Sequence, residues 1–331
     1  MYCLGIDTSN YTTSAALVDT EFNIVSDSRE VLKVKQGERG LRQSQALFEH
    51  IGNLPGIIDA LGYNENDAEI AVVAVSDRPR QIEGSYMPVF KAGETVGKSI
   101  ASMTGAKYCS FSHQEGHIEA AGKFTDVLEK KEFLSLHLSG GTTEVLKCMR
   151  NEETCGYISE IVGGTRDISL GQLIDRIGVS LGLSFPCGKF MDEAACRDIG
   201  SKEGLKAFCK IKVDDCMMNI SGIETQIQRR IMEKAGKDGD NSVMLESISR
   251  AVLFRAAQSV EDVIAQARAK TGIQDVLVAG GVASSRYVRN YLSRDSRISF
   301  GREALSSDNA VGTALLGMRK YLKMKDSVTG I

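Results

Sequence analysis

The chain has 331 residues, 42% of them hydrophobic and 25% charged, so it is long enough for two domains of ordinary size. Its formal net charge of −3 at pH 7 argues against a protein that holds nucleic acid alone through a broad basic face, but leaves open a nucleic acid delivered with a partner's help. No apolar run reaches the roughly 18 residues that a membrane-spanning helix needs, so we expect no membrane association.

The first expected element is a β-hairpin. An apolar strand at 2–7 enters a run of small polar residues, and a second apolar strand at 14–18 leaves it. Residues 91–103 predict a buried helix, because apolar residues from Ala92 to Met103 recur at helical spacing. A helix at 40–60 and a strand at 70–75 are expected between these elements.

A second hairpin is predicted at 133–148, where Leu134, Leu136 and Leu138 alternate before the turn S-G-G-T-T at 139–143. The pattern of strand, small-residue turn and strand therefore occurs twice, which indicates two related halves facing one another. The later elements alternate between helix and strand, as in an α/β protein. They are helices at 171–181, 242–270, 286–292 and 310–321, and a strand at 276–279 that ends at Gly280 and Gly281.

The eight cysteines are scattered without a C-x-x-C pair, and no charged-then-apolar signal peptide opens the sequence. We therefore expect reduced thiols in a cytoplasmic protein. A chain of this length builds a sizeable core, so a disulfide framework is not expected.

Two of the four histidines, His113 and His117, lie four residues apart. Ser112 and Glu115 form a capping-box pattern that marks a helix start, so both imidazoles would share one helix face and could hold one metal ion. Spacing alone supports a plain pair of surface or core histidines equally well. The H-E-x-x-H motif of metalloproteases is not matched, because Glu115 follows the first histidine by two residues and points off the metal face. A protease is therefore a poor interpretation.

Two aspartates are further candidates. Asp308 lies at a loop-to-helix junction, where local sequence alone favours a helix N-cap over a metal ligand. Asp7 ends the first strand, where its carboxylate would either meet a ligand or cap the turn. We expect Asp7 to be the catalytic candidate of the N-terminal part of the chain.

Glycine-rich turns offer candidate anion sites. The turn at 139–143 presents consecutive backbone N–H groups with little side-chain obstruction, which suits a phosphate, although many such hairpins bind nothing. Gly280 and Gly281, between a strand and a helix, let the backbone approach a ligand closely. Asp175 suits a solvated helix face as well as a ligand contact, and Gly188 belongs to a tight turn.

Taken in order, these segments resemble the TsaD family of tRNA N6-threonylcarbamoyladenosine synthases, formerly labelled O-sialoglycoprotein endopeptidases. The resemblance runs from Gly5 to Gly317 and rests on the order and spacing of five motifs. Asp175 and Gly188 fall where the family has the Asp of A-G-E-A-F-D and a Gly of Y-P-G-G. The other matches are H-Q-E-G-H at 113–117 to H-x-E-G-H, S-G-G-T-T at 139–143 to S-G-G-H-T, A-G-G-V at 279–282 to the same letters, and S-D-N-A at 307–310 to T-D-N-A.

The resemblance implies a two-lobed actin-like (ASKHA) fold with a nucleotide or adenylate in the cleft between the lobes. Residues 1–110 and 307–331 would form one lobe and 111–306 the other. The resemblance also implies one divalent ion, iron or zinc, on His113, His117 and Asp308.

The implied reaction is transfer of a threonylcarbamoyl group from an acyl-adenylate to N6 of adenosine in tRNA. ATP or AMP with Mg is the related ligand, TsaB-like or TsaE-like proteins are the implied partners, and a homodimer is a further assembly. The residues implied to hold the adenylate are His137, Leu138, Ser139, Gly140, Gly141, Asp175, Gly188, Gly280, Gly281 and Ser285.

Several positions depart from the family pattern. Residues 6–13 read I-D-T-S-N-Y-T-T where the family has I-E-T-S-C-D-E-T, and residues 77–80 replace its G-P-G. Thr142 stands for a histidine, Ser285 for an asparagine and Glu224 for a lysine. The implied metal ligands are kept while first-lobe loops are rewritten. A paralogue with another acceptor or an ATP-dependent reaction, or a nucleotide-binding partner subunit without catalysis, therefore stays open as an alternative.

Overall fold

The computed structural model describes residues 1–9, 11–33, 41–64, 68–82, 84–197, 208–234 and 241–329. The chain divides into two compact units, and the α/β class predicted from the sequence is confirmed. The first unit comprises Met1–Lys123, Arg150–Ile158 and Ser307–Ile331, and the second comprises Phe124–Met149 and Ser159–Ser306. The lobe boundaries expected from the sequence stay a prediction.

The first unit contains a five-stranded sheet in the order β3-β2-β1-β4-β5. The predicted N-terminal hairpin is confirmed, since β1 pairs antiparallel with β2, and residue 10 at its tip lies outside the described residues. On its other side β1 runs parallel to β4, which runs parallel to β5. The strands are β1 (Tyr2–Asp7), β2 (Thr12–Asp19), β3 (Ile24–Val31), β4 (Ile70–Arg78) and β5 (Lys107–Ser112).

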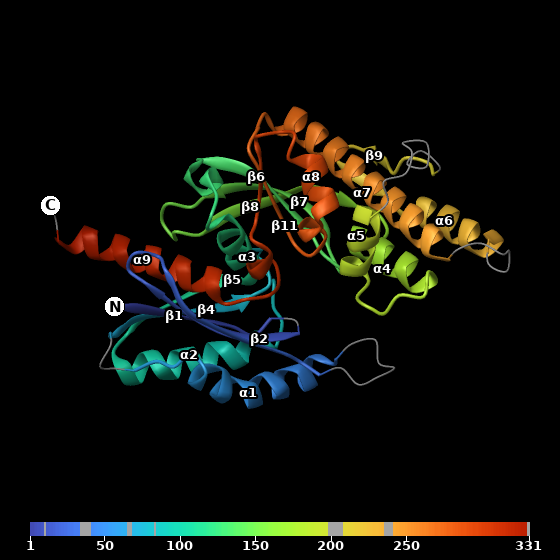
Figure 1. The fold of residues 1–331 in the computed structure, drawn as a ribbon. Helices are drawn as coiled ribbons and strands as arrows, with labels where there is room; N and C mark the ends of the chain where they lie inside the picture. The colour runs from blue at the N-terminus through green and yellow to red at the C-terminus, as the bar shows by residue number, and fades with distance from the viewer. Residues whose placement is uncertain are drawn as a thin grey trace. The chain divides into compact units, whose positions relative to one another are not determined.

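Alternate residues of β1 face opposite layers of the first unit. Leu4 and Ile6 join a core with residues of α1 and α2, which pack on one face of the sheet (Figure 1). Gly5 faces α9 on the other side, where an added Cβ would lie 2.7 Å from Cβ of Ala314. The helices are α1 (Gln43–Asp59), α2 (Phe90–Thr104), α3 (His113–Gly122) and α9 (Val311–Thr329). The predicted helix at 40–60 corresponds to α1, and residue 40 lies outside the described residues.

The second sheet repeats the topology of the first. Its order is β12-β11-β6-β7-β8-β10-β9, so β8-β7-β6-β11-β12 matches β3-β2-β1-β4-β5. As in the first sheet, the hairpin β6-β7 is antiparallel, and β6 runs parallel to β11, which runs parallel to β12. The predicted internal repeat is thus confirmed as two sheets of related topology. The strands are β6 (Glu132–Leu138), β7 (Thr143–Arg150), β8 (Tyr157–Thr165), β9 (Lys212–Asp214), β10 (Met217–Asn219), β11 (Val276–Ala279) and β12 (Ile298–Phe300).

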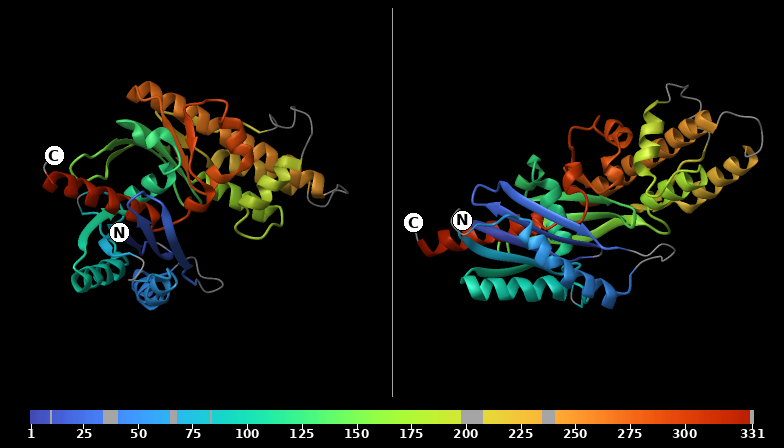
Figure 2. Two further views of the ribbon diagram at one scale, coloured as in Figure 1. Left: turned by 60° about the vertical axis from the view of Figure 1, so that its left-hand side comes forward. Right: turned by 60° about the horizontal axis from the view of Figure 1, so that its bottom comes forward.

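A group of helices packs with the second sheet around one large apolar core. The long helix α7 packs along α5 and α8, as Figure 2 shows for the yellow-green to orange part of the ribbon. In the described ranges, none of the helices is both long and apolar enough to span a membrane. The helices are η1 (Asp126–Glu129), α4 (Leu170–Ser180), α5 (Gly188–Arg197), α6 (Ser221–Lys234), α7 (Asn241–Thr271), η3 (Val282–Ser284), α8 (Arg286–Leu292) and η4 (Glu303–Leu305).

Candidate metal centre

Strand β5 passes directly into α3, and the capping box predicted at this junction is confirmed. The hydroxyl oxygen of Ser112 accepts a hydrogen bond from the backbone N–H of Glu115 at 3.3 Å, and Oε2 of Glu115 accepts one from the backbone N–H of Ser112 at 2.7 Å. The cap fixes His113 as the first helical residue, with His117 one turn later on the same face.

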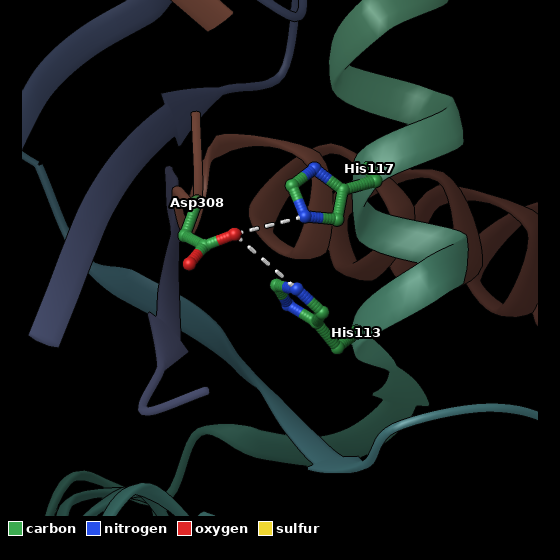
Figure 3. A group of neighbouring side chains, drawn as sticks. All are labelled: His113, His117 and Asp308. Carbon is green, nitrogen blue, oxygen red and sulfur yellow. Dashed lines mark hydrogen bonds and ion pairs between the residues drawn. The ribbon is translucent and has the colours of Figure 1, made fainter. Parts of the chain in front are cut away.

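The two imidazoles and the carboxylate of Asp308 converge on one point of the first unit (Figure 3). Nε2 of His117 lies 3.1 Å and Nε2 of His113 lies 3.5 Å from Oδ1 of Asp308. The imidazole rings are 4.2 Å apart between centroids, edge to face. The possible ligand atoms of all three residues lie within 4.8 Å of one another, so the sequence-predicted trio is brought together.

A close crossing of α3 and α9 places Asp308 beside the histidines. A Cβ on Gly116 would lie 2.9 Å from Oγ1 of Thr313, and one on Gly312 would overlap the carbonyl group of Gly116. The two glycines therefore let the helix backbones approach closely. Because Asp308 precedes α9 by only a few residues, this crossing carries its carboxylate to the first turn of α3.

The helix-cap interpretation of Asp308, which local sequence favours, is wrong. Oδ1 of Asn309 accepts the hydrogen bond from the backbone N–H of Val311 at 3.0 Å. Asn309 therefore satisfies the backbone donor at the start of α9. The carboxylate of Asp308 is left to face the two imidazoles, which is the arrangement that a metal ligand requires.

Asp7 lies behind His113, fully buried at the end of β1. Its Oδ2 accepts hydrogen bonds from Nδ1–H of His113 at 2.8 Å and from the hydroxyl of Ser76 at 2.6 Å. Its Oδ1 accepts one from the backbone N–H of Ser9 at 2.8 Å, so Asp7 also caps the turn. Because Nδ1–H is held by Asp7, Nε2 is the nitrogen of His113 that faces Asp308 and would bind an ion there.

The electrostatics of the centre follow from this packing. Burial opposes charge on His113, but the negative charges of Asp7 and Asp308 and their hydrogen bonds raise its pKa to about 10. Burial likewise opposes charge on Asp308, yet its contacts with His113 and His117 hold its pKa well below the ordinary value. The pKa of Asp7 is lowered in the same way, against burial, by His113. The two carboxylates thus stabilise positive charge at this point, whether it is the proton on His113 or a metal cation.

The donor set fits a divalent metal ion. Two imidazole nitrogens and a carboxylate oxygen within 4.8 Å of one another match the ligands that zinc and ferrous iron accept. The carboxylate of Asp7 on the far nitrogen of His113 is a typical outer partner of a metal-binding histidine. Sequence reasoning did not identify Ser76, whose signal is a polar residue directly after the apolar run at 70–75.

In the second unit, the predicted anion turn follows β6. The hydroxyl of Ser139 accepts a hydrogen bond from the backbone N–H of Thr142 at 3.0 Å. The hydroxyl of Ser169, at the N-cap of α4, donates to the carbonyl oxygen of Gly140 at 2.7 Å. Gly140 and Gly141 are exposed, and a Cβ on either would meet no atom of the described residues within 4 Å. The hydroxyls of Ser139 and Ser169 therefore fix the conformation of the turn, while the backbone of Gly140 and Gly141 is accessible to solvent.

Other predicted second-lobe residues have structural contacts of their own. Leu138 is buried, and His137 pairs in register with Ala279 of β11. Gly280 has φ of +100°, and a Cβ there would overlap the backbone of Leu138, so this position requires glycine. Gly281 is exposed, and in the part of the chain that the structure describes no atom lies within 4 Å of an added Cβ.

Asp175 and Ser285 each bind protein groups. Oδ1 of Asp175 accepts the backbone N–H of Cys187 at 2.8 Å, which ties α4 to the residue before Gly188. The hydroxyl of Ser285 donates to Oδ1 of Asp192 at 2.5 Å. Asp192 also accepts the backbone N–H groups of Arg286 and Tyr287, so its carboxylate covers the start of α8. Sequence reasoning missed Asp192, which lies beside Glu193 in a helix and carries no local signal that separates it from a solvated acid.

Comparison with known proteins gives the same family over most of the chain. Residues 25–315 match the sequence model of TsaD, described as tRNA N6-adenosine threonylcarbamoyltransferase. A protein of that name from Wolbachia pipientis wMel is 25% identical over 338 residues, covering 97% of this chain and 93% of its own. One from Sulfurihydrogenibium sp. is 29% identical over 355 residues, covering 99% and 93%.

Solved structures share the fold at much lower identity. Component A of the (R)-2-hydroxyglutaryl-CoA dehydratase of Acidaminococcus fermentans has a TM-score of 0.53 at 14% identity, over 97% of this chain and 99% of that one. A ROK family glucokinase from Streptomyces griseus has a TM-score of 0.51 at 12% identity, over 96% and 100%. The expected actin-like (ASKHA) fold is therefore confirmed, and with residues 25–315 matched to its model, the chain belongs to the TsaD family.

Proposed function

We propose that this chain is an acyltransferase that moves a threonylcarbamoyl group from an acyl-adenylate to N6 of adenosine in tRNA. The family supports this reaction, since relatives over nearly the whole chain carry the corresponding name. The observation that carries the proposal is the convergence of His113, His117 and Asp308 within 4.8 Å. A carboxylate and two imidazoles from distant parts of the sequence meet there without serving as ordinary helix caps.

His113, His117 and Asp308 would hold one divalent ion, iron or zinc, which the ligand set suits equally. When bound, such an ion supplies Lewis-acid charge that offsets the negative charge of an acyl-adenylate. Asp7 fixes the imidazole of His113 through Nδ1–H, so that Nε2 is the nitrogen that would give up its proton and bind the ion. We assign Asp7 this orienting role in the reaction, and no general base is proposed.

The turn at 139–143 is the proposed phosphate contact of the adenylate. The exposed backbone of Gly140 and Gly141 offers N–H donors, and such donors stabilise charge that develops as AMP leaves. His137, Leu138 and Gly280 would shape the turn from β6 and β11. The remaining proposed contacts of the nucleotide are Ser139, Asp175, Gly188, Gly281 and Ser285.

The proposal extends to the setting of the reaction. With a net charge of −3, the chain would need partner proteins, TsaB-like or TsaE-like, to hold tRNA. The site of action would be the cytoplasm. Mg with ATP or AMP would be the additional ligand, and a homodimer is a further assembly to test by sedimentation.

Metal content and transfer activity test this proposal together. The single variants His113→Ala and His117→Ala should lose the ion and the transfer activity, because each removes one of three ligands. Metal is measured by inductively coupled plasma mass spectrometry, and transfer by nucleoside analysis of tRNA after reaction with the adenylate and partner proteins. His137→Ala, a histidine of the second unit, is the matched control and should keep its metal. Full metal occupancy in the double alanine variant would refute the metal centre.

The same assay distinguishes the alternative activities. Turnover of ATP without transfer from the adenylate would favour an ATP-dependent reaction on this fold. Tight nucleotide binding with neither reaction, even with partner proteins present, would favour a binding subunit. Native mass spectrometry of the purified protein would show which metal and which adenosine derivative co-purify with it.

A further inference from the structure

The face of α3 opposite the histidines carries a second set of buried acids. Glu115 and Glu119 are one turn apart, 2% and 0% exposed, and point away from the side of the helix that bears His113 and His117. Neither acid belongs to the proposed ligand set. Both carboxylates accept hydrogen bonds from neighbouring groups. Because burying a carboxylate costs free energy, their burial requires a structural or functional reason.

Tyr157 binds both acids at once. Its backbone N–H donates to Oε1 of Glu115 at 3.1 Å, and its hydroxyl donates to Oε2 of Glu119. Tyr157 is itself fully buried, and burial raises the pKa of its phenol well above the ordinary value. Nε of Arg319 on α9 donates to the other oxygen of Glu119 at 2.7 Å. The segment Arg150–Ile158 is therefore tied to α3 and, through Glu119, to α9.

Glu115 carries this connection to the first turn of α3. Its Oε2 accepts from the backbone N–H and the hydroxyl of Ser112, both at 2.7 Å, while Oε1 accepts from Tyr157. Ser112 is the residue directly before His113. Gly156 packs so closely that an added Cβ would overlap Oε1 of Glu115. One carboxylate therefore links the backbone beside a metal ligand to a segment about forty residues later in the sequence.

We propose that Glu115, held by Tyr157 and Gly156, is a positioning residue that sets the affinity of the metal centre by fixing the first turn of α3. The proposal rests on the metal centre of the proposed function. A change in Glu115 would let His113 move relative to His117 and Asp308, and so weaken a geometry that needs all three ligands. Outer partners of metal ligands typically change affinity by about 10- to 100-fold when they are removed.

Two variants approach this contact from opposite sides. Glu115→Gln keeps the shape but replaces one acceptor oxygen with a donor, which then faces the N–H or hydroxyl donors of Ser112 or the N–H of Tyr157. Gly156→Ala leaves the sequence of α3 unchanged and displaces the carboxylate of Glu115 by steric overlap. Glu129→Gln, an exposed acid of η1, controls for the loss of one negative charge.

The test titrates Co2+ into metal-free full-length protein. It follows the absorption spectrum, which reports ligand geometry, and the dissociation constant from a competing chelator. Folding of each variant is checked by circular dichroism at the same temperature. We expect Glu115→Gln and Gly156→Ala each to weaken Co2+ binding by about 10- to 100-fold and to alter the spectrum, with less than additive effects in the double variant.

The outcomes separate the two proposals. If the wild type binds Co2+ and both folded variants bind it with unchanged affinity and spectrum, Glu115 is a stabilising group only and the positioning role is refuted. If Glu115→Gln does not fold, Gly156→Ala decides the question by itself. A wild type that binds no Co2+ would refute the metal centre, and the positioning role with it.

Discussion

Replacing Asp7 by asparagine tests how the centre selects the binding form of His113. The buried carboxylate accepts three hydrogen bonds, from Ser9, Ser76 and His113, at 2.8, 2.6 and 2.8 Å. An amide has the same shape but offers one oxygen acceptor and one nitrogen donor. The substitution therefore removes a charge and an acceptor without leaving a cavity.

Both orientations of the new amide are unfavourable. With nitrogen in place of Oδ1, the amide faces the N–H of Ser9, and two donors meet. With nitrogen in place of Oδ2, the amide donates to Nδ1 of His113, whose proton then moves to Nε2. That tautomer has no lone pair to direct at an ion beside Asp308. A hydrogen bond to a charged group contributes about 1.5–3 kcal/mol. This range corresponds to a loss of about 10- to 100-fold in metal affinity.

The measurement is the Co2+ dissociation constant of metal-free Asp7→Asn, with the tautomer of His113 read from nitrogen-15 chemical shifts. We expect the affinity loss given above and a population of His113 protonated on Nε2. Asp19→Asn is the control, since among the described residues the carboxylate of Asp19 accepts from Glu21 and Asn23 of the turn after β2. Affinity within about twofold of the wild type would show that the carboxylate of Asp7 does not orient the imidazole, and would refute the reasoning.

Two further predictions concern the second unit. Burial opposes ionisation of Asp167, but hydrogen bonds from the backbone of Ile220, Ser221 and Ile168 lower its pKa from 3.8 to about 2. A carboxylate whose pKa is lower in the folded than in the unfolded state stabilises the fold at pH values above its unfolded-state pKa. The free energy of unfolding that Asp167→Asn loses should therefore be constant above about pH 4 and should vanish as the pH falls to about 2. Urea midpoints of wild type and variant that differ equally at pH 5 and pH 2 would contradict this. Gly280→Ala should lower the free energy of unfolding by about 1–3 kcal/mol or more, because φ is +100° and the Cβ would overlap Leu138. The control Gly281→Ala should change it by no more than about 0.5 kcal/mol. Equal urea midpoints for the two variants would contradict the requirement for glycine at position 280.

The sequence by itself determined the local chemistry of this protein. Alternating apolar residues and small-residue turns predicted both hairpins, because side chains of a strand alternate between faces whatever the strand packs against. The pair Ser112 and Glu115 predicted where α3 begins, since a capping box needs only residues three apart. The start of the helix in turn put His113 and His117 on one face. The family resemblance added the order of motifs, which no single motif specifies.

Only the tertiary structure decided which distant groups meet. Asp308 and Asn309 are both good helix caps in sequence, and the choice depends on the crossing of α3 and α9, which brings Asp308 to a histidine 191 residues away. Ser285 donates its hydrogen bond to Asp192, which lies 93 residues away in the sequence. This contact is at the start of α8, and no local pattern predicts it. Such contacts depend on how helices and sheets pack. A local motif reports only the chemistry within a few residues of itself, so it leaves the third ligand and the outer partners of the centre undetermined.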